Sequence, residues 1–347
     1  MHSLAHTLRQ VLVEDIGLRH GSSLLLAVSG GPDSMAMLHL MASLEPPLGL
    51  NLYAAYIDHG LRPGESPQEW QLVQAACSQL SISSTRIQVD ARAEAARHKL
   101  SLEHAARELR YQALERLQLE LSFQWLVLAH TADDQVEELL LRILRGGSRQ
   151  ALAGMRLCSG TRIRPLLLVH KNELLAYMDA YGYSYCHDSS NDDLSFLRNR
   201  IRHHLLPLLE QEYDAGVRRA LLKCADTFAA DEDLLGQLQE QAWNKTINTT
   251  MSVGADGSVQ PKWVLNLPSF VQLHPALQRR VLERLLYTAQ GKAVYEHIMA
   301  LHKLVAFAVH GKELHLSQGL RALVDKDTLV FTFPWGKGAT RRSCKAE

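Results

Sequence analysis

The sequence has little cysteine, no excess of charge of either sign and no long apolar run. Its five cysteines are an odd number without a CxxC pair, which is typical of reduced thiols rather than of a zinc or iron–sulfur framework. Basic and acidic residues number 37 each, so any nucleic-acid-binding surface must be local. No apolar stretch approaches the ~18 residues of a membrane span. We therefore expect a cytoplasmic protein without membrane attachment.

The chain also lacks two common nucleotide-binding signatures. Neither GxxxxGK[ST] nor GxGxxG fits its glycine-rich loop, so neither a Walker A loop nor a Rossmann dinucleotide turn is indicated. Length and composition are those of an ordinary globular protein, because 347 residues with 46% hydrophobic and 21% charged content suffice for two domains with a sizeable core.

The most informative stretch is residues 24–38, LLLAVSGGPDSMAML. Its apolar start predicts a strand buried on both faces, and the loop SGGPDS separates this strand from a helix over 35–44. Two glycines let the backbone approach a ligand without a Cβ, and the amides at the helix start face an anion. Ser34 is expected to cap the helix. The pattern predicts a phosphate site, and a Gly-Gly-Pro surface turn is the alternative.

Alternation of strands and helices predicts an α/β fold with a doubly wound parallel sheet. Further strands are expected over 52–57, 82–89 and 125–129, and helices over 68–80, 102–119, 133–144 and 171–181. Beyond the catalytic domain we expect a smaller, mainly helical domain with helices to 242 and over 275–287 and 294–309, a loop or hairpin turn over 244–258, and short strands over 313–316, 320–324 and 328–333.

These elements predict three segments. Residues 1–213 would form the catalytic domain, 214–335 a smaller C-terminal domain, and 336–347 a disordered basic tail. In the second segment Arg218, Arg219, Lys223, Arg279, Arg280 and Arg284 supply local positive charge. An ordinary solvated helix face is the alternative for them.

Polar side chains follow the second and fourth strands, where open α/β sheets bind their ligands. The second strand ends at DHGLR (58–62) and the fourth runs into HTADDQVE. Asp134 and Glu137 share a face of the predicted helix, where two carboxylates can hold a divalent ion or an ammonium group. A solvated acidic helix start is the alternative, above all for Asp133. His130 either lines a nucleotide pocket or satisfies backbone groups.

Two groups of arginines complete the candidates. Arg107 and Arg110 lie one turn apart on a predicted helix and suit ATP phosphates, with a surface helix laced with Glu–Arg pairs as the alternative. Residues 198–202, RNRIR, begin the densest basic cluster. Alternate arginines do not share one helix face, so we expect some of them to belong to a loop or helix start that contacts phosphates. A solvated cluster is the alternative.

Together these motifs resemble one family. SGGPDS, DHGLR, LEHAARELRY, LAHTADDQVE with LRILRGG, DSSND and RNRIRHHLLP occur in the order and spacing of the tRNA(Ile)-lysidine synthetases, which belong to the PP-loop ATP pyrophosphatases. The resemblance covers residues 22–210 and extends more weakly over 215–333, and it implies that the C-terminal domain over 214–335 is a tRNA-recognition domain. Glu138 stands where the family usually has threonine. The chain is expected to lack the additional C-terminal domain of longer members.

The resemblance implies a two-step reaction on the wobble cytidine of isoleucine tRNA with a CAU anticodon. ATP would adenylate the base with release of pyrophosphate, and free L-lysine would then displace AMP. Mg2+ is implied at Asp33 and Asp134. The implied catalytic residues are Asp33, Arg107, Arg110, Asp134, Glu137 and Arg202. The implied ATP-binding residues are Ser29, Gly30, Gly31, Pro32, Asp33, Ser34, His59, Arg107, Ala129 and His130. Lysine or tRNA contacts are implied for Asp134, Glu137, Arg198, Arg200 and Arg202.

Three other functions use a similar core. A tRNA thiolase would normally need paired cysteines, and a PP-loop amidotransferase such as an NAD or GMP synthetase would usually need an N-terminal nucleophilic cysteine for its ammonia supply; the chain has neither. A nonenzymatic ATP-binding protein would need the phosphate loop but neither the acidic pair nor the arginine helix. The sequence does not fix the oligomeric state, and a homodimer is one option.

Overall fold

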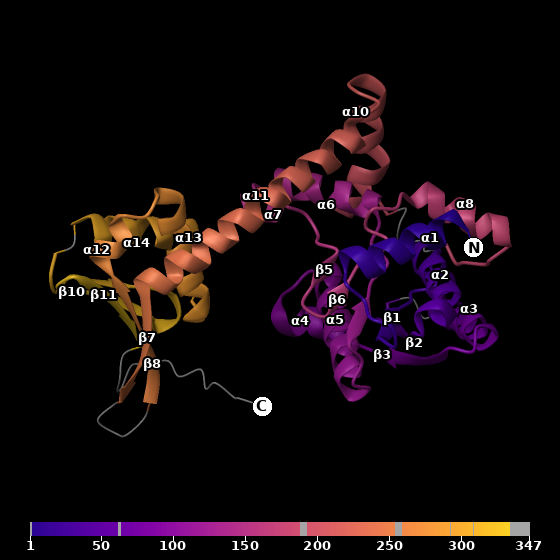
Figure 1. Ribbon diagram of the computed structural model, residues 1–347, viewed down its shortest axis with the longest axis horizontal. Coiled ribbons are helices and arrows are strands. Elements are labelled where there is room, and N and C mark those ends of the chain that lie inside the picture. The colour runs from indigo at the N-terminus through magenta and orange to yellow at the C-terminus, as the bar shows by residue number, and fades with distance from the viewer. Residues whose placement is uncertain are drawn as a thin grey trace. The chain divides into compact units, whose positions relative to one another are not determined.

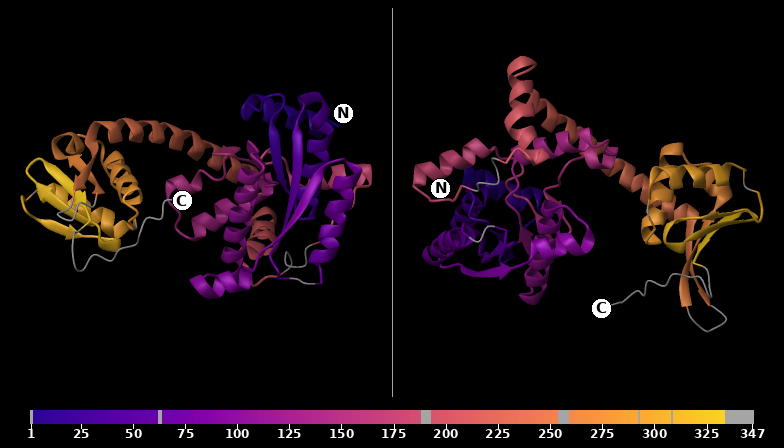
Figure 2. Two further views of the ribbon diagram at one scale, coloured as in Figure 1. Left: turned by 90° about the horizontal axis from the view of Figure 1, so that it is seen from below. Right: turned by 180° about the vertical axis from the view of Figure 1, so that it is seen from behind.

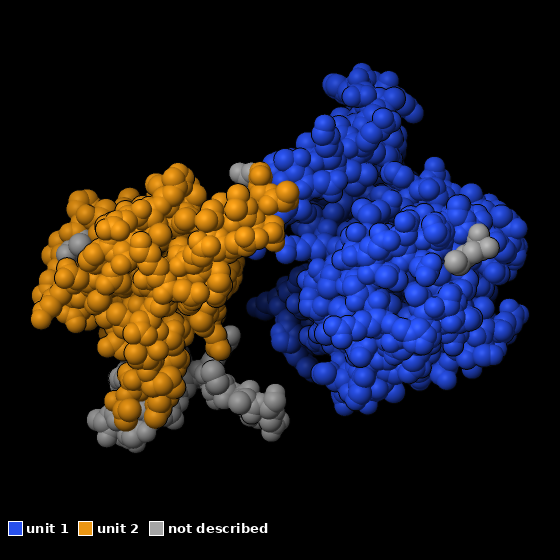
Figure 3. All heavy atoms as spheres, viewed as in Figure 1, with its two compact units in different colours: residues 1–229 blue, residues 230–347 orange. Residues whose placement is uncertain are grey.

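The computed structural model describes residues 2–61, 64–187, 193–253, 259–291, 293–307 and 309–333. The DSSND motif, Arg62 of DHGLR and the tail over 336–347 lie outside the described residues. The chain divides into two compact units, residues 1–229 and 230–347 (Figure 3). The sequence placed the end of the catalytic domain at 213, in the turn before helix α11 (Val217–Thr246), whereas the compact units divide inside that helix.

The first unit is built on a six-stranded sheet with the order β3-β2-β1-β4-β6-β5. Its strands are β1 (Ser23–Ala27), β2 (Asn51–Asp58), β3 (Ser83–Gln88), β4 (Trp125–Val127), β5 (Cys158–Ser159) and β6 (Arg162–Ile163). All neighbours pair in parallel except β5 and β6, so the predicted α/β fold is confirmed. The chain runs from β1 outward through β2 and β3 and returns to β4 on the other side of β1. This reversal creates a switch point at the carboxyl ends of β1 and β4.

Helices cover both faces of this sheet (Figures 1 and 2). The helical segments of the unit are α1 (Ser3–Gln10), η1 (Val11–Asp15), α2 (Pro32–Leu48), α3 (Ser66–Gln79), α4 (Ala91–His98), α5 (Leu102–Glu120), α6 (Ala132–Leu144), α7 (Arg149–Leu152), α8 (Lys171–Tyr181), α9 (Leu197–Arg200), η3 (Ile201–Leu205) and α10 (Leu206–Glu212). Leu24 and Leu26 of β1 join a core with α1, α2, α3 and α8, whereas Leu25 faces Leu114 of α5 on the other side. The sheet is therefore buried on both faces, as its continuous apolar strands predict.

Two local predictions for the first unit need correction. The helix after the phosphate loop does not stop before Pro46 and Pro47, because both prolines fit into its last turn and Gly49 ends it in the left-handed conformation with φ 60°. Helix α4 was not predicted, since residues 91–98 carry charge and alanine rather than an apolar stripe. Within the described residues, no helix combines the length and apolarity needed to cross a bilayer.

The second unit packs helices against a five-stranded antiparallel sheet with the order β7-β8-β11-β10-β9. Its elements after α11 are β7 (Ile247–Val253), β8 (Val259–Asn266), α12 (Leu267–Val271), α13 (Pro275–Thr288), α14 (Tyr295–Phe307), β9 (Glu313–His315), η4 (Ser317–Gly319), β10 (Arg321–Asp325) and β11 (Thr328–Thr332). The last three strands match the prediction. Of the stretch 244–258, predicted as a loop or hairpin turn, residues 247–253 form the strand β7, which pairs antiparallel with β8, and residues 254–258 lie outside the described residues. The exposed face of β7 tolerates its polar residues.

Candidate active site

The phosphate loop lies at the switch point of the sheet, between the end of β1 and the start of α2. Gly30 has φ +84°, a conformation that favours glycine, and Gly31 is the N-cap of α2. Ser34 does not cap the helix as expected. Its hydroxyl instead accepts a hydrogen bond from the Ser29 N–H at 3.1 Å and donates to the Gly31 carbonyl at 2.9 Å, which closes the loop on itself. The free amides at the start of α2 therefore face the carboxyl edge of the sheet.

Asp33, in the first turn of α2, has one buried oxygen, Oδ1, without a hydrogen-bond partner. The ammonium group of Lys171 lies 3.7 Å from its other oxygen, Oδ2. Burial raises the pKa of Asp33 to about 6, against the opposing effect of Lys171, and Asp134 raises it further. A carboxylate with an unused, buried oxygen is a suitable ligand for a hard cation such as Mg2+, which usually takes one or two carboxylates together with phosphates.

Asp134 and Glu137 share a face of α6, as predicted, but both are engaged by arginines. Glu137 is 2% exposed, and its oxygens accept hydrogen bonds from Arg198 Nε at 2.8 Å and from Arg202 Nε at 2.6 Å. Asp134 Oδ1 accepts from Arg198 at 3.0 Å, and its Oδ2 forms a capping box with Thr131 at the start of α6. Burial alone would raise the pKa of the Asp134 carboxyl, but Arg198 together with His130, the Thr131 N–H and Arg202 holds this pKa below its usual value.

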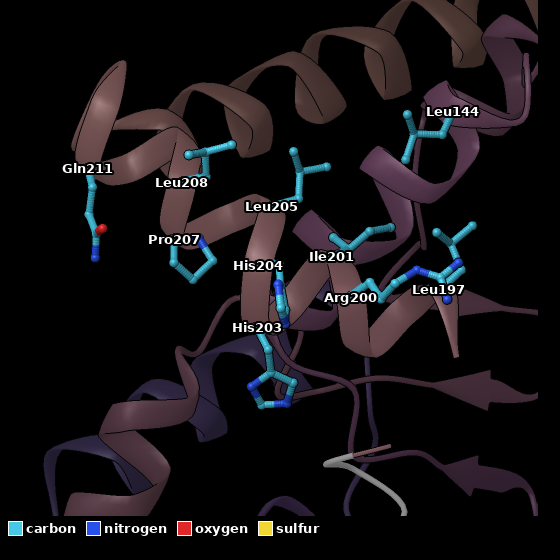
Figure 4. A pocket seen from close by; sticks show the side chains of 10 residues that line it. All are labelled: Leu144, Leu197, Arg200, Ile201, His203, His204, Leu205, Pro207, Leu208 and Gln211. Carbon is cyan, nitrogen blue, oxygen red and sulfur yellow. The ribbon is translucent and has the colours of Figure 1, made fainter. Parts of the chain in front are cut away.

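The three arginines of RNRIR separate into two sets. Arg198 and Arg202 are one turn apart and face the acidic pair, whereas Arg200 donates to the carbonyls of Leu194 and Ser195 at 3.0 and 2.9 Å. The structure thus brings two of them into the site. Arg200 instead borders a hollow of about 580 Å3, whose lining residues are Leu144, Leu197, Arg200, Ile201, His203, His204, Leu205, Pro207, Leu208 and Gln211 (Figure 4).

A further group of cations surrounds Tyr111 of α5. The guanidinium groups of Arg107, Arg110 and Arg162 lie 5.3, 5.9 and 4.8 Å from the centre of its ring. Glu115 pairs with Arg162, but within the described part of the chain no carboxylate is ion-paired with Arg107 or Arg110. Burial lowers the pKa of the Arg110 guanidinium. The Glu–Arg pairing expected of an ordinary surface helix is therefore not what holds these two residues.

His130 and His59 follow the ends of β4 and β2, as the sequence predicted. Ala129 precedes His130 at the end of β4 and packs partly buried against the core. Burial lowers the pKa of His130 to about 4, so the ring is neutral at pH 7, and its Nδ1 is buried without a partner. Arg107, Arg110 and Arg164 all lie near enough to depress this pKa further. His130 is thus next to a group of cations rather than bonded to the backbone through Nδ1.

Two site residues escaped sequence reasoning. Lys171 is the first residue of α8 and contacts Asp33. Arg164, which follows β6, is 8% exposed, and its Nε is buried without a partner. Neither belongs to a recognisable motif, since Arg164 follows Arg162 by two positions and Lys171 stands among polar residues at a helix start. For Arg164 the available signal was its place after a short strand of the predicted sheet.

Of the basic residues predicted to favour RNA, half are paired internally. Arg218 contacts Glu210 and Asp133, Arg280 contacts Glu232, and Arg284 contacts Glu240. Within the described residues, no ion pair involves the remaining three, Arg219, Lys223 and Arg279. The local positive charge is therefore smaller than the residue count suggested.

The sheet order and the loop at its switch point define a PP-loop nucleotide-binding protein, and residues 2–209 match the family model described as a PP-loop domain. The chain is 32% identical over 325 residues to the tRNA(Ile)-lysidine synthase of Geobacillus kaustophilus, covering 91% of this chain and 68% of that protein. It is 34% identical over 302 residues to the synthase of Gloeobacter violaceus, covering 85% and 86%. The chain belongs to the tRNA(Ile)-lysidine synthase family.

Further comparisons agree with this assignment. The synthase of Geobacter sulfurreducens is 35% identical over 309 residues, which are 86% of this chain and 63% of that protein. Among solved structures, a U34-tRNA thiolase from Methanococcus maripaludis with a [4Fe-4S] cluster superposes with a TM-score of 0.54 at 18% identity, covering 65% of this chain and 78% of that one. This second likeness establishes the shared fold alone.

Proposed function

We propose that this chain is an ATP-dependent carbon–nitrogen ligase that attaches free L-lysine to C2 of the wobble cytidine in the CAU anticodon of isoleucine tRNA. The observation that carries the proposal is the phosphate loop at the β1–β4 switch point, where the start of α2 meets the unpartnered Asp33 Oδ1. Family membership supports the choice of base and amino acid. The site of action would be the cytoplasm, and assembly as a homodimer stays a prediction.

Mg2+ would be held at Asp33 through Oδ1, with Asp134 Oδ1 as a second ligand. Asp134 Oδ1 accepts one hydrogen bond from Arg198, so a lone pair remains for a cation. When bound, Mg2+ would neutralise phosphate charge. The N–H groups of Gly31, Asp33 and Ser34 would bind the phosphates from the other side, since Pro32 has none, and Ala129, His130 and His59 would border the nucleotide at the ends of β4 and β2.

In the first step, the cytidine O2 attacks the α-phosphate, a C–O–P bond forms and pyrophosphate leaves. Negative charge accumulates on the phosphates as the bond between the α and β phosphates breaks, so cations placed beforehand lower the barrier. Arg107 and Arg110 suit this role because they lack carboxylate partners within the described residues and lie near the neutral His130. A guanidinium already paired with a carboxylate would stabilise this charge less.

In the second step, the lysine ε-amine attacks C2 and AMP leaves. A free lysine amine has a pKa of ~10.4, so it must lose a proton after binding. Asp134 and Glu137 would attract the ammonium group, and Arg202 with Arg198 would bind the lysine carboxylate or the RNA backbone. Because these four side chains already bond to one another, lysine would bind by exchanging some of those hydrogen bonds.

RNA contacts would come from the outer side of α9 and from the second unit. Carbonyl oxygens hold Arg200 without neutralising its charge, and His203 and His204 line the hollow beside it. Methionine tRNA also carries a CAU anticodon, so discrimination needs contacts elsewhere on the tRNA. The candidates for these contacts are Arg279 of the second unit and Arg219 and Lys223 of α11.

The decisive test incubates the protein with labelled lysine, ATP, Mg2+ and unmodified isoleucine tRNA, with methionine tRNA as the matched control. We expect lysine in isoleucine tRNA only, with equal amounts of pyrophosphate and AMP released. Pyrophosphate release with incorporation of sulfur instead of lysine would favour a thiolase, against which the lack of a CxxC pair argues. ATP binding without either product would favour the nonenzymatic function.

A further inference from the structure

Lys171 is fixed at the junction of the two loops that form the site. It opens α8, and its backbone N–H donates to Asp133 Oδ2 at 2.8 Å, which ties it to the loop after β4. Leu174, Tyr177 and Met178 of α8 are buried in the core that also contains α2. The backbone of Lys171 is therefore held in place, while its side chain, 34% exposed, extends to Asp33 in the first turn of α2.

The segment that follows α8, residues 182–186, also contacts the phosphate loop. The Cys186 N–H donates to the carbonyl of Gly30 at 2.9 Å. Between these points Tyr183 stacks on His39 of α2 with ring centres 3.6 Å apart and planes 4° from parallel. Contacts at Lys171, Tyr183 and Cys186 thus set the position of this segment relative to α2. The ammonium group is placed by the fold and not by a chance surface contact.

The charges around Lys171 leave it able to bind an anion. Its side chain meets one oxygen of Asp33 at 3.7 Å, which is longer than a good hydrogen bond. The same oxygen lies in the first turn of α2, whose free amides attract phosphates. A primary ammonium has three N–H donors, so contact with Asp33 leaves donors for a second acceptor.

We propose that Lys171 is a nucleotide-binding residue whose ammonium group donates to the β- and γ-phosphates of ATP and balances the charge of the departing pyrophosphate. The inference rests on the proposed function only in that ATP occupies the phosphate loop. A lysine reaching the terminal phosphates from a neighbouring element would supply the point charge that the SGGPDS loop itself lacks.

The test measures binding to the full chain without tRNA, by calorimetry in excess Mg2+. The probes are α,β-methylene-ATP, inorganic pyrophosphate and AMP. Lys171→Met should weaken the first two about tenfold to a hundredfold, as expected for a lost hydrogen bond to a charged group, and leave AMP within about twofold. Lys171→Arg should restore most of the affinity. Lys303→Met, which removes an exposed lysine of the second unit, should change nothing.

Unchanged affinity of Lys171→Met for pyrophosphate, or an equal loss for AMP, would overturn the proposal. Titrating pyrophosphate in EDTA into Asp33→Asn, with and without Lys171→Met, separates direct contact from positioning of Asp33. The Lys171 effect must persist there, and its disappearance would reduce Lys171 to a positioning residue. If the wild-type chain binds these probes but never ligates lysine, the proposed function fails and this inference stands.

Discussion

At the start of α2, one oxygen of Asp33 is buried without a partner, whereas both oxygens of Glu137 accept hydrogen bonds from arginines. The two carboxylates belong to the same unit and follow neighbouring strands. His130 and Arg164, like Asp33, each have one buried polar side-chain atom without a hydrogen-bond partner among the described residues. At Glu137, by contrast, the carboxylate accepts hydrogen bonds from Arg198 and Arg202, so the opposite charges pair with one another. Buried polar groups without partners cost free energy, so their accumulation at one edge of the sheet indicates a place where a ligand completes the bonding.

Besides its proposed part in lysine binding, the acid–arginine cluster has a structural role. It joins α6 to α9 and η3, segments whose apolar sides also meet through Val136, Leu140 and Ile201. A buried pair of this kind holds its elements in one arrangement, and removal of one member leaves a buried charge unpaired. The comparison predicts that variants in this cluster act on stability as well as on lysine binding, whereas variants at the phosphate edge act on binding and rate with little effect on stability.

The largest effect is expected for Glu137→Gln. This change leaves Arg198 and Arg202 without their shared carboxylate, so the first unit should lose about 3 to 5 kcal/mol of stability in urea unfolding. Glu120→Gln is the control, because Glu120 is 57% exposed and pairs with the exposed Arg116 outside the cluster, and should cost under about 1 kcal/mol. A raised KM for lysine is expected beside the loss, because Glu137 is also proposed to attract the lysine ammonium group, whereas normal stability of Glu137→Gln would contradict the structural role of the cluster.

Asp33→Asn should have the opposite pattern, with a large effect on activity and little effect on stability. The change removes a carboxylate whose burial is unfavourable, so stability should hold, while tRNA-dependent pyrophosphate release should fall by roughly 10²- to 10³-fold. Circular dichroism and thermal unfolding confirm the fold, and pyrophosphate release is measured over a range of Mg2+ concentrations. Release close to the wild-type rate would contradict the assignment of the phosphate loop.

The same contrast separates what sequence reasoning could reach from what it could not. Asp33 was found because a strand, two glycines and a helix start are consecutive in the chain, and its geometry is local. The partners of Glu137 lie on another helix, so the sequence placed Glu137 and Arg202 in one site without predicting that they bind each other. Lys171 and Arg164 went unnoticed because their significance comes from tertiary packing and neither residue belongs to a motif.

A smaller effect tests how α8 supports the phosphate edge. Burial lowers the pKa of His39 from 6.5 to about 4, so the unfolded chain binds its proton before the folded one does. This residue's contribution to stability is intact above pH 6.5 and should fall by about 2 kcal/mol between pH 7 and 5. Asp33 has the opposite sign, because its raised pKa makes the folded chain bind a proton first.

The measured quantity is therefore the difference in unfolding free energy between the wild type and His39→Phe at each pH. Phenylalanine keeps a ring to stack on Tyr183 but does not titrate. The advantage of the wild type should shrink on acidification, and parallel pH profiles for the two proteins would contradict the assigned pKa.

The smallest effect is expected for Arg164→Met, which tests whether a buried polar atom without a partner marks a ligand site. The Arg164 guanidinium donates from Nη1 to the Arg156 carbonyl at 2.9 Å, while its buried Nε has no partner within the described residues. Replacing an arginine that stabilises the fold should lower the free energy of unfolding. Replacing an arginine whose buried N–H is paired only when a ligand binds should not, because that unpaired group already destabilises the free protein. Methionine fills a similar volume without polar atoms.

We therefore expect unchanged or slightly raised stability, with affinity for α,β-methylene-ATP or for isoleucine tRNA lowered about tenfold, as for a lost charged hydrogen bond. The two ligands are titrated separately, so that the loss identifies which phosphates Arg164 meets. Arg156→Met serves as the control, because it leaves the carbonyl that receives Nη1. A clear fall in stability with both affinities intact would show that Arg164 is a structural residue, like the paired charges around Glu137. The buried polar atoms without partners at this edge would then reflect imperfect packing and not a ligand site.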